Sequence, residues 1–93
     1  MMDKYWLALI FLFKENGKLS RYATSEYIDL AAGTVHVKKL QTVSKPWSAS
    51  ERFMLQLALH LYSERNKVNL SDMDRLDSYN KKLALQAIQI RFF

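Results

Sequence analysis

A chain of 93 residues, 49% of them hydrophobic, is long enough for one domain and too rich in apolar side chains for a disordered segment. Two glycines and one proline are too few for the turns of a β-sandwich or barrel, and the lack of cysteine excludes disulfides and thiolate zinc sites. The net charge of +5 permits an acidic partner, but the fourteen basic residues are spread along the chain, as on an ordinary soluble surface. Composition therefore favours a single helical domain over residues 1–93.

The first element is an apolar run from Tyr5 to Phe13. It is much shorter than the roughly 20 residues of a membrane span, and no basic segment precedes it as in a signal peptide, so we expect a cytoplasmic protein. The run alone fits a buried strand as well as a helix. Asp3 is a suitable N-cap, Lys14 suits a last turn, and Gly17 stands where a C-terminal cap belongs. These flanking residues favour a buried helix over residues 4–15.

Residues 18–44 are the least regular part of the sequence. Leu19–Ala23 has the spacing of a short helix, and Gly33 marks a turn. Thr34–Val37 alternates like a strand that Tyr27–Leu30 would have to pair with, but a ribbon of that size is only marginally stable by itself. We therefore expect an irregular segment with a helical turn near residues 37–43.

The longest helix is predicted over residues 48–66. Ser48 and Glu51 form a capping box, and Trp47, just before the cap, is placed to fix the helix entry onto the core. Most of the helix circumference is apolar, and a narrow polar stripe is left. The stripe consists of Arg52, Gln56, His60, Ser63 and Glu64. Such a helix must be central, with neighbours on several sides, and the aromatic residues of the first helix are expected to pack against it.

Two further helices are predicted after a short connection. Ser71 to Asp74 resembles a capping box, which indicates a short helix over residues 72–76. Asp77 and Ser78 then cap a last helix over residues 79–92. The expected fold is therefore all-α, a small bundle of three main helices with short helical segments and an irregular region at residues 18–44.

Residues 47–91 resemble small uncharacterised bacterial helical proteins. The resemblance is carried by Trp-Ser-x-x-Glu-Arg, Leu-Ala-x-x-Leu-Tyr, Val-x-Leu, Leu-Asp-x-x-Asn and Ala-Ile-x-Ile-Arg, all of which fall between Trp47 and Arg91. The run at Tyr5–Leu9 is similar too. What the resemblance implies is an intracellular all-helical bacterial domain of plasmid or phage origin, with no activity or functional residue attached.

No set of residues has the spacing of a catalytic or metal site. His36 and His60 stand in different elements, and the two glycines do not form a phosphate-binding loop. Asp72, Asp74 and Asp77 lack the glycine and distal glutamate of a calcium loop and are expected to stabilise helix N-termini. The sequence thus predicts a protein without enzymatic activity or cofactor.

The remaining hypothesis is a protein–protein interaction module. Three helices with mostly apolar surfaces are too few to cover one another, and uncovered apolar area usually marks an interface. A homodimer is the simplest solution, and a different protein partner remains open. Candidate interface residues are Trp6, Gln86, Gln89, Ile90, Phe92 and Phe93.

The alternative is a helix-turn-helix-like, nucleic-acid-binding regulatory protein. The net charge has the required sign, but the last helix offers glutamines and one lysine on its polar face where a DNA reader also displays arginine. Candidate contacts to nucleic acid are Lys38, Lys39, Lys81, Lys82 and Arg91.

Overall fold

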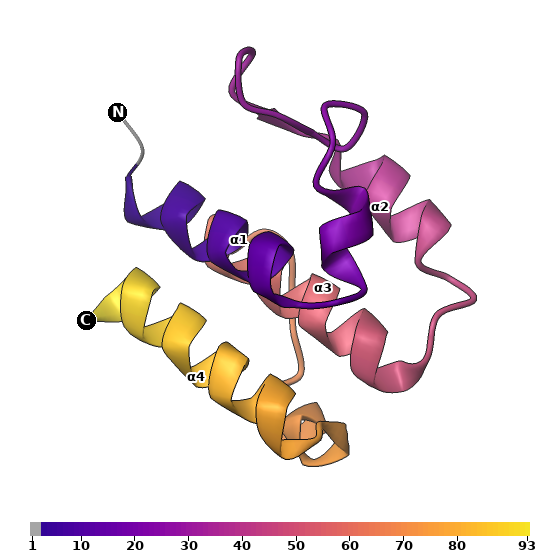
Figure 1. Cartoon of the computed structure of the whole chain (residues 1–93), viewed down its shortest axis with the longest axis vertical. Helices are drawn as coiled ribbons and strands as arrows, with labels where there is room; N and C mark the ends of the chain where they lie inside the picture. Colours follow the sequence, from indigo (N-terminus) through magenta and orange to yellow (C-terminus); the bar gives the residue numbers. More distant parts are fainter. Residues whose placement is uncertain (1–2) are drawn as a thin grey trace.

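The protein is built from three long helices with shorter elements between them (Figure 1). The computed structural model describes residues 3–93. In chain order, with η for a 3₁₀-helix, the elements are α1 (Lys4–Glu15), η1 (Leu19–Tyr22), β1 (Ile28–Asp29), β2 (Thr34–Val35), α2 (Val37–Val43), α3 (Ala49–Tyr62), η2 (Leu70–Arg75) and α4 (Ser78–Phe92). The predicted mostly helical fold with three main helices is confirmed.

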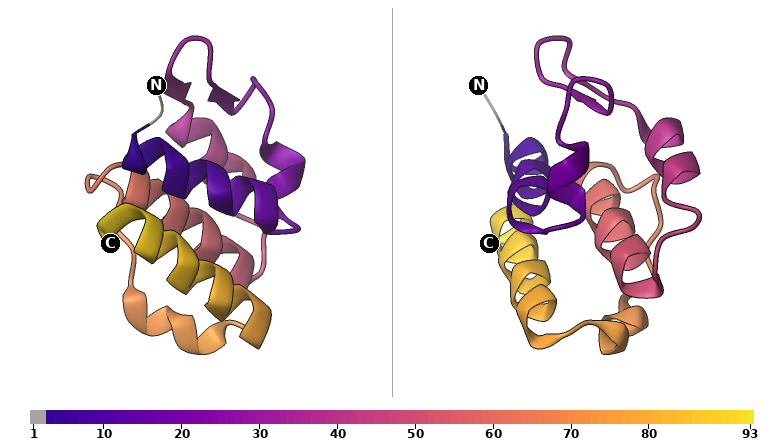
Figure 2. Two further views of the ribbon diagram at one scale, coloured as in Figure 1. Left: turned by 60° about the vertical axis from the view of Figure 1, so that its left-hand side comes forward. Right: turned by 45° about the vertical axis from the view of Figure 1, so that its right-hand side comes forward.

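Helix α3 is the central element, as its nearly all-round apolar surface predicts. It packs against α1, α4, η1 and η2, and α1 also packs against α4 (Figure 2). The side chains of α3 in the core are Phe53, Met54, Leu55, Leu57, Ala58, Leu59 and Leu61. Trp47 is 7% exposed and packs on Tyr22 at 5.0 Å between ring centroids, so it fixes the entry of α3 onto the core as expected.

The starts of the main helices follow the caps seen in the sequence. The carboxylate of Asp3 accepts two backbone N–H groups of α1, each at 3.1 Å. Ser48 and Glu51 form the predicted capping box, with bonds of 3.0 and 3.3 Å. Asp77 accepts the backbone N–H of Asn80 at 2.8 Å and caps α4. Each of these side chains lies within three residues of the amides that it satisfies, so these helix starts can be predicted without the tertiary structure.

Helix α3 is shorter than its predicted extent of residues 48–66, because it ends at Tyr62. Ser63 is extended, and the chain turns back so that the side-chain amide of Asn66 donates to the carbonyls of Leu59 and Ser63 at 3.3 and 3.4 Å. His60 Nδ1 donates to the carbonyl oxygen of Asn66 at 2.9 Å. These bonds hold the turn against the end of α3 and satisfy carbonyls at and beyond its last turn.

The helix after this turn also begins earlier than predicted. It is the 3₁₀-helix η2, Leu70–Arg75, in place of an expected helix over residues 72–76. Asn69, and not Ser71, caps it by accepting the backbone N–H of Ser71 at 3.1 Å.

The expected C-terminal cap of α1 at Gly17 is wrong. Asn16 ends the helix in an extended conformation, and among residues 3–93 the one positive φ belongs to Gly33. The side chain of Asn16 then begins η1 by accepting the backbone N–H groups of Lys18 and Leu19, each at 3.0 Å.

Residues 18–44 are more ordered than the sequence indicates. Ile28 pairs with Val35 and Asp29 with Thr34 in an antiparallel ribbon, and Gly33 turns between the strands with a φ of 66°. A ribbon of this size is stable because Ile28 lies in the core. The predicted helical segments are present as η1 and α2.

Candidate interaction surface

Helix α4 is apolar on two sides. Its inner side places Leu83, Ala84 and Ala87 in the core. Its outer side carries Leu85 and Phe92, which are 55% and 56% exposed. Helix α4 therefore packs against the core on one side and leaves large apolar side chains exposed to solvent on the other.

A shallow groove of about 520 Å³ runs along α4 beside α1. It is lined by Phe11, Gln86, Gln89, Ile90 and Phe93. These residues together with Leu85 are called the α1–α4 surface below. None of its six side chains is charged.

Most of the interface residues predicted on the last helix meet in this groove. Phe11 is expected only as one of the aromatic residues of the first helix, and Leu85 is not among the predicted residues. Phe93 is 96% exposed. The first helix is apolar around most of its circumference, so only its packing against α4 decides which aromatic side chain is left at the rim. Leu85 could have been found from its spacing, because it lies one helical turn from both Lys82 and Gln89.

Phe92 points to a second depression, of about 240 Å³, between α4 and the end of α3. Its lining comprises Leu57, His60, Leu61, Val68, Leu70, Ile88 and Phe92. Leu70 is 56% exposed at this depression. The two last aromatic residues therefore flank the end of α4 on different sides, and Phe92 is placed apart from the α1–α4 surface.

Trp6 lies apart from the groove as well. Its ring meets the ring of Tyr62 edge to face, with 5.1 Å between centroids, and is partly buried against the core. Trp6 therefore joins α1 to the end of α3 and is not among the residues that line the groove.

Arg91 is engaged inside the protein. Its Nε donates to the carbonyl of Leu61 at 3.1 Å, and its guanidinium lies 3.9 Å from the ring centroid of Tyr5 and 4.4 Å from that of Phe92. These contacts tie the ends of α3 and α4 to the start of α1 and help to orient Phe92. Arg91 is therefore held in place by contacts within the protein.

The other candidate contacts to nucleic acid lie in two separate places. Lys38 and Lys39 line a depression on α2 beside Tyr27, whereas Lys81 and Lys82 stand at the start of α4. Helices α2 and α4 are on opposite sides of the molecule (Figures 1 and 2). The structure does not bring the five candidates together.

Tyr27 is a neutral group beside these α2 lysines. Desolvation raises its pKa above the ordinary value, and repulsion from Glu26 and from Tyr22 adds to this. The phenol is therefore protonated at neutral pH.

The described part of the chain holds no cluster of three or more His, Cys, Asp or Glu side chains that could bind a metal ion. Within residues 3–93, no helix is both long and apolar enough to cross a membrane.

No family model matches the chain, and neither a curated protein nor a solved structure is significantly similar to it. The resemblance to small bacterial helical proteins stays a prediction.

Proposed function

We propose that this protein is a cytoplasmic interaction module that works through contacts rather than catalysis, and that its α1–α4 surface binds a second copy of the chain. The observation that carries the proposal is the outward part of this surface on α4, where Leu85 and Phe93 are 55% and 96% exposed on a helix whose other face lies in the core. Covering these side chains removes apolar area from water, at about 25 cal/mol for each Å² buried.

A second copy suits this surface because the surface is self-complementary. Each copy offers an uncharged groove and, at its end, the protruding ring of Phe93. The side-chain amides of Gln86 and Gln89 both donate and accept hydrogen bonds. Across a two-fold axis, the glutamine amides of one copy can therefore bond to those of the other. A stable dimer needs about 800 Å² from each partner, so the proposed dimer also buries residues of α1 and α4 that flank the six residues of this surface.

The test replaces Leu85, the more exposed of the two aliphatic side chains of this surface, by a charged residue. Leu85→Glu places two carboxylates in a two-fold interface and should raise the dimer dissociation constant by at least about tenfold, because desolvated unpaired charges oppose association. Leu30→Glu is the matched control, since Leu30 is similarly exposed, at 52%, but lies in the turn of the hairpin. Sedimentation equilibrium measures both constants, and circular dichroism checks the fold.

The proposal fails if the wild-type chain is monomeric up to high concentration, or if the two glutamate variants weaken association equally. The competing nucleic-acid function is tested on the same samples with duplex DNA. Salt-dependent binding that Lys81→Gln and Lys82→Gln abolish would favour the start of α4 as a DNA contact instead.

A further inference from the structure

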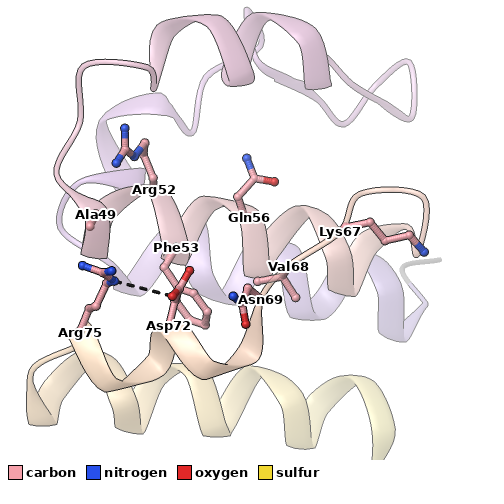
Figure 3. Close-up of a pocket in the computed structure, with 9 residues that line it drawn as sticks. All are labelled: Ala49, Arg52, Phe53, Gln56, Lys67, Val68, Asn69, Asp72 and Arg75. Atoms are coloured by element: carbon pink, nitrogen blue, oxygen red, sulfur yellow. Dashed lines mark ion pairs between the residues drawn. The ribbon is translucent and has the colours of Figure 1, made fainter.

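A separate pocket of about 280 Å³ lies where α3 faces the segment that leads into η2 (Figure 3). Its lining comprises Ala49, Arg52, Phe53, Gln56, Lys67, Val68, Asn69, Asp72 and Arg75. It shares no residue with the α1–α4 surface. Its chemistry can therefore be considered independently of self-association.

The pocket carries more positive than negative charge. Arg52, Lys67 and Arg75 line it with a single carboxylate, that of Asp72. Figure 3 shows the two arginines toward one end and Lys67 at the other. Phosphate and carboxylate groups are the anions that guanidinium groups bind best in proteins.

The guanidinium groups keep free donors in this arrangement. Nε of Arg75 lies 3.6 Å from Oδ1 of Asp72, and both side chains are well exposed, at 62% and 44%, so this ion pair is weak and easily rearranged. One N–H of Arg52 donates to the carbonyl of Lys45 at 3.2 Å. A guanidinium has five N–H donors, which leaves several on each arginine for a ligand.

The inner wall of the pocket is apolar. Phe53, which is 4% exposed, and Val68 form this wall, and the side-chain amides of Gln56 and Asn69 add polar groups around it. An apolar wall with a few convergent polar groups is typical of small-molecule sites. The arrangement suits a ligand with an anionic head and a compact apolar body.

We propose that this pocket binds a small organic phosphate. A phosphate monoester carries about −1.5 to −2 charges at neutral pH, which matches the excess of two positive side chains better than a monovalent carboxylate does. The phosphate is assigned to the end of the pocket that Arg52 and Arg75 line, and the body of the ligand to the apolar wall at Phe53. The volume is just below the roughly 300 to 1,000 Å³ of drug-sized sites, so the body is no larger than a single ring or short carbon skeleton.

The test uses phenyl phosphate as the probe and follows backbone amide shifts by NMR. Saturable shifts are expected around Arg52, Gln56 and Asn69. Arg52→Gln and Arg75→Gln should each raise the dissociation constant roughly three- to tenfold, since each removes a charged donor at a partly exposed site. Asp72→Asn should lower it, because the change removes a competing carboxylate and releases Arg75.

The Asp72→Asn variant gives the clearest result, because weaker binding of phenyl phosphate in this variant would contradict the assignment of Asp72 as a carboxylate that competes with the phosphate for Arg75. Lys38→Gln, on α2, is the matched control for net charge and should change the constant less than twofold. If Lys38→Gln weakens the binding of phenyl phosphate as much as the arginine variants do, the attraction is non-specific and the proposed site is rejected.

Two further probes separate phosphate from other anions. If benzoate binds as tightly as phenyl phosphate, the assignment of the ligand as a phosphate is overturned. Inorganic phosphate should bind more weakly than phenyl phosphate, because it lacks the aromatic ring that packs on the apolar wall. Absence of saturable shifts with phenyl phosphate would reject the proposal. Because Arg75 is exposed, Arg75→Gln is expected to fold even if Arg52→Gln does not. Leu85→Glu should bind phenyl phosphate like the wild type.

Discussion

Asn16 joins three elements through one buried side chain that is 5% exposed. Its Oδ1 accepts the backbone N–H groups of Lys18 and Leu19 at 3.0 Å, and its Nδ2 donates to Oδ1 of Asn80 at 2.8 Å. The end of α1, the start of η1 and the first turn of α4 are therefore held at one point. Buried amides satisfied in this way fix a geometry, since any other arrangement leaves a polar group without a partner.

Asn16→Ala is expected to lower the free energy of unfolding by about 2 to 3 kcal/mol, the sum of a lost cap and a lost buried hydrogen bond. Urea denaturation followed by circular dichroism measures the change. Asn80→Ala removes only the bond between the two side chains and should cost about 1 kcal/mol. Similar costs in both variants would mean that the bonds to η1 contribute nothing.

Helix α3 owes its start to the capping box and ends where the chain turns back at Asn66. At the start, the backbone N–H of Ser48 donates to the carboxylate of Glu51, and this bond is the largest cause of a lowered Glu51 pKa. Desolvation opposes the shift, and the positive charge of Lys18, 3.9 Å away, adds to it. The charged form of Glu51 is thus favoured in the folded state.

The capping box therefore predicts a pH dependence of stability. Because the folded pKa of Glu51 is below its ordinary value of 4.5, the stabilisation is complete above that pH and is lost as the pH falls through the folded pKa. Glu51→Gln keeps an acceptor for the Ser48 N–H but cannot titrate. Denaturation midpoints of wild type and variant, compared between neutral and acid pH, should converge on acidification. A constant difference across this range would rule out the linkage.

At the scale of the whole molecule, the distribution of charge along α4 favours an antiparallel orientation for the proposed dimer. Lys81 and Lys82 stand at the start of the helix, and the aromatic pair Phe92 and Phe93 stands at its end. In a parallel pair of α4 helices, lysines would face lysines. In an antiparallel pair, the lysines of one copy approach the aromatic rings of the other, which is an attractive cation–π arrangement.

This orientation can be tested by cross-linking, because the chain has no cysteine of its own. Lys82→Cys and Phe93→Cys proteins, mixed under mild oxidation, should form a disulfide between the two different variants more readily than within either variant alone. Adding Leu85→Glu to both should suppress the product. Preferential formation of a disulfide within each variant would instead indicate a parallel pair. Whether the chains associate through this surface at all is decided by the comparison of Leu85→Glu with Leu30→Glu.

The features that the sequence predicts correctly depend on neighbouring residues. Caps at Asp3, Ser48 and Asp77 bond to amides a few residues along, and the apolar circumference of α3 requires neighbours in any arrangement. Of the candidate interface, the outward glutamines of α4 are recognisable because their spacing follows the helix period. Local bonds and periodicity act in the same way whatever the rest of the chain does.

Only the tertiary structure decided the features that depend on residues far apart in the sequence. The ribbon at Ile28 and Val35 is stable through the core, and the hydrogen bond from Asn16 to Asn80 spans most of the chain. The same holds for Phe11, which lies at the rim of a groove because α4 covers one side of α1, and for Arg91, whose charge is engaged by Leu61 and Tyr5. The spacing of apolar residues in the sequence indicates how apolar each face of a helix is. Which face is covered depends on how much area each possible pairing of helices removes from water, and that is a property of the assembled chain.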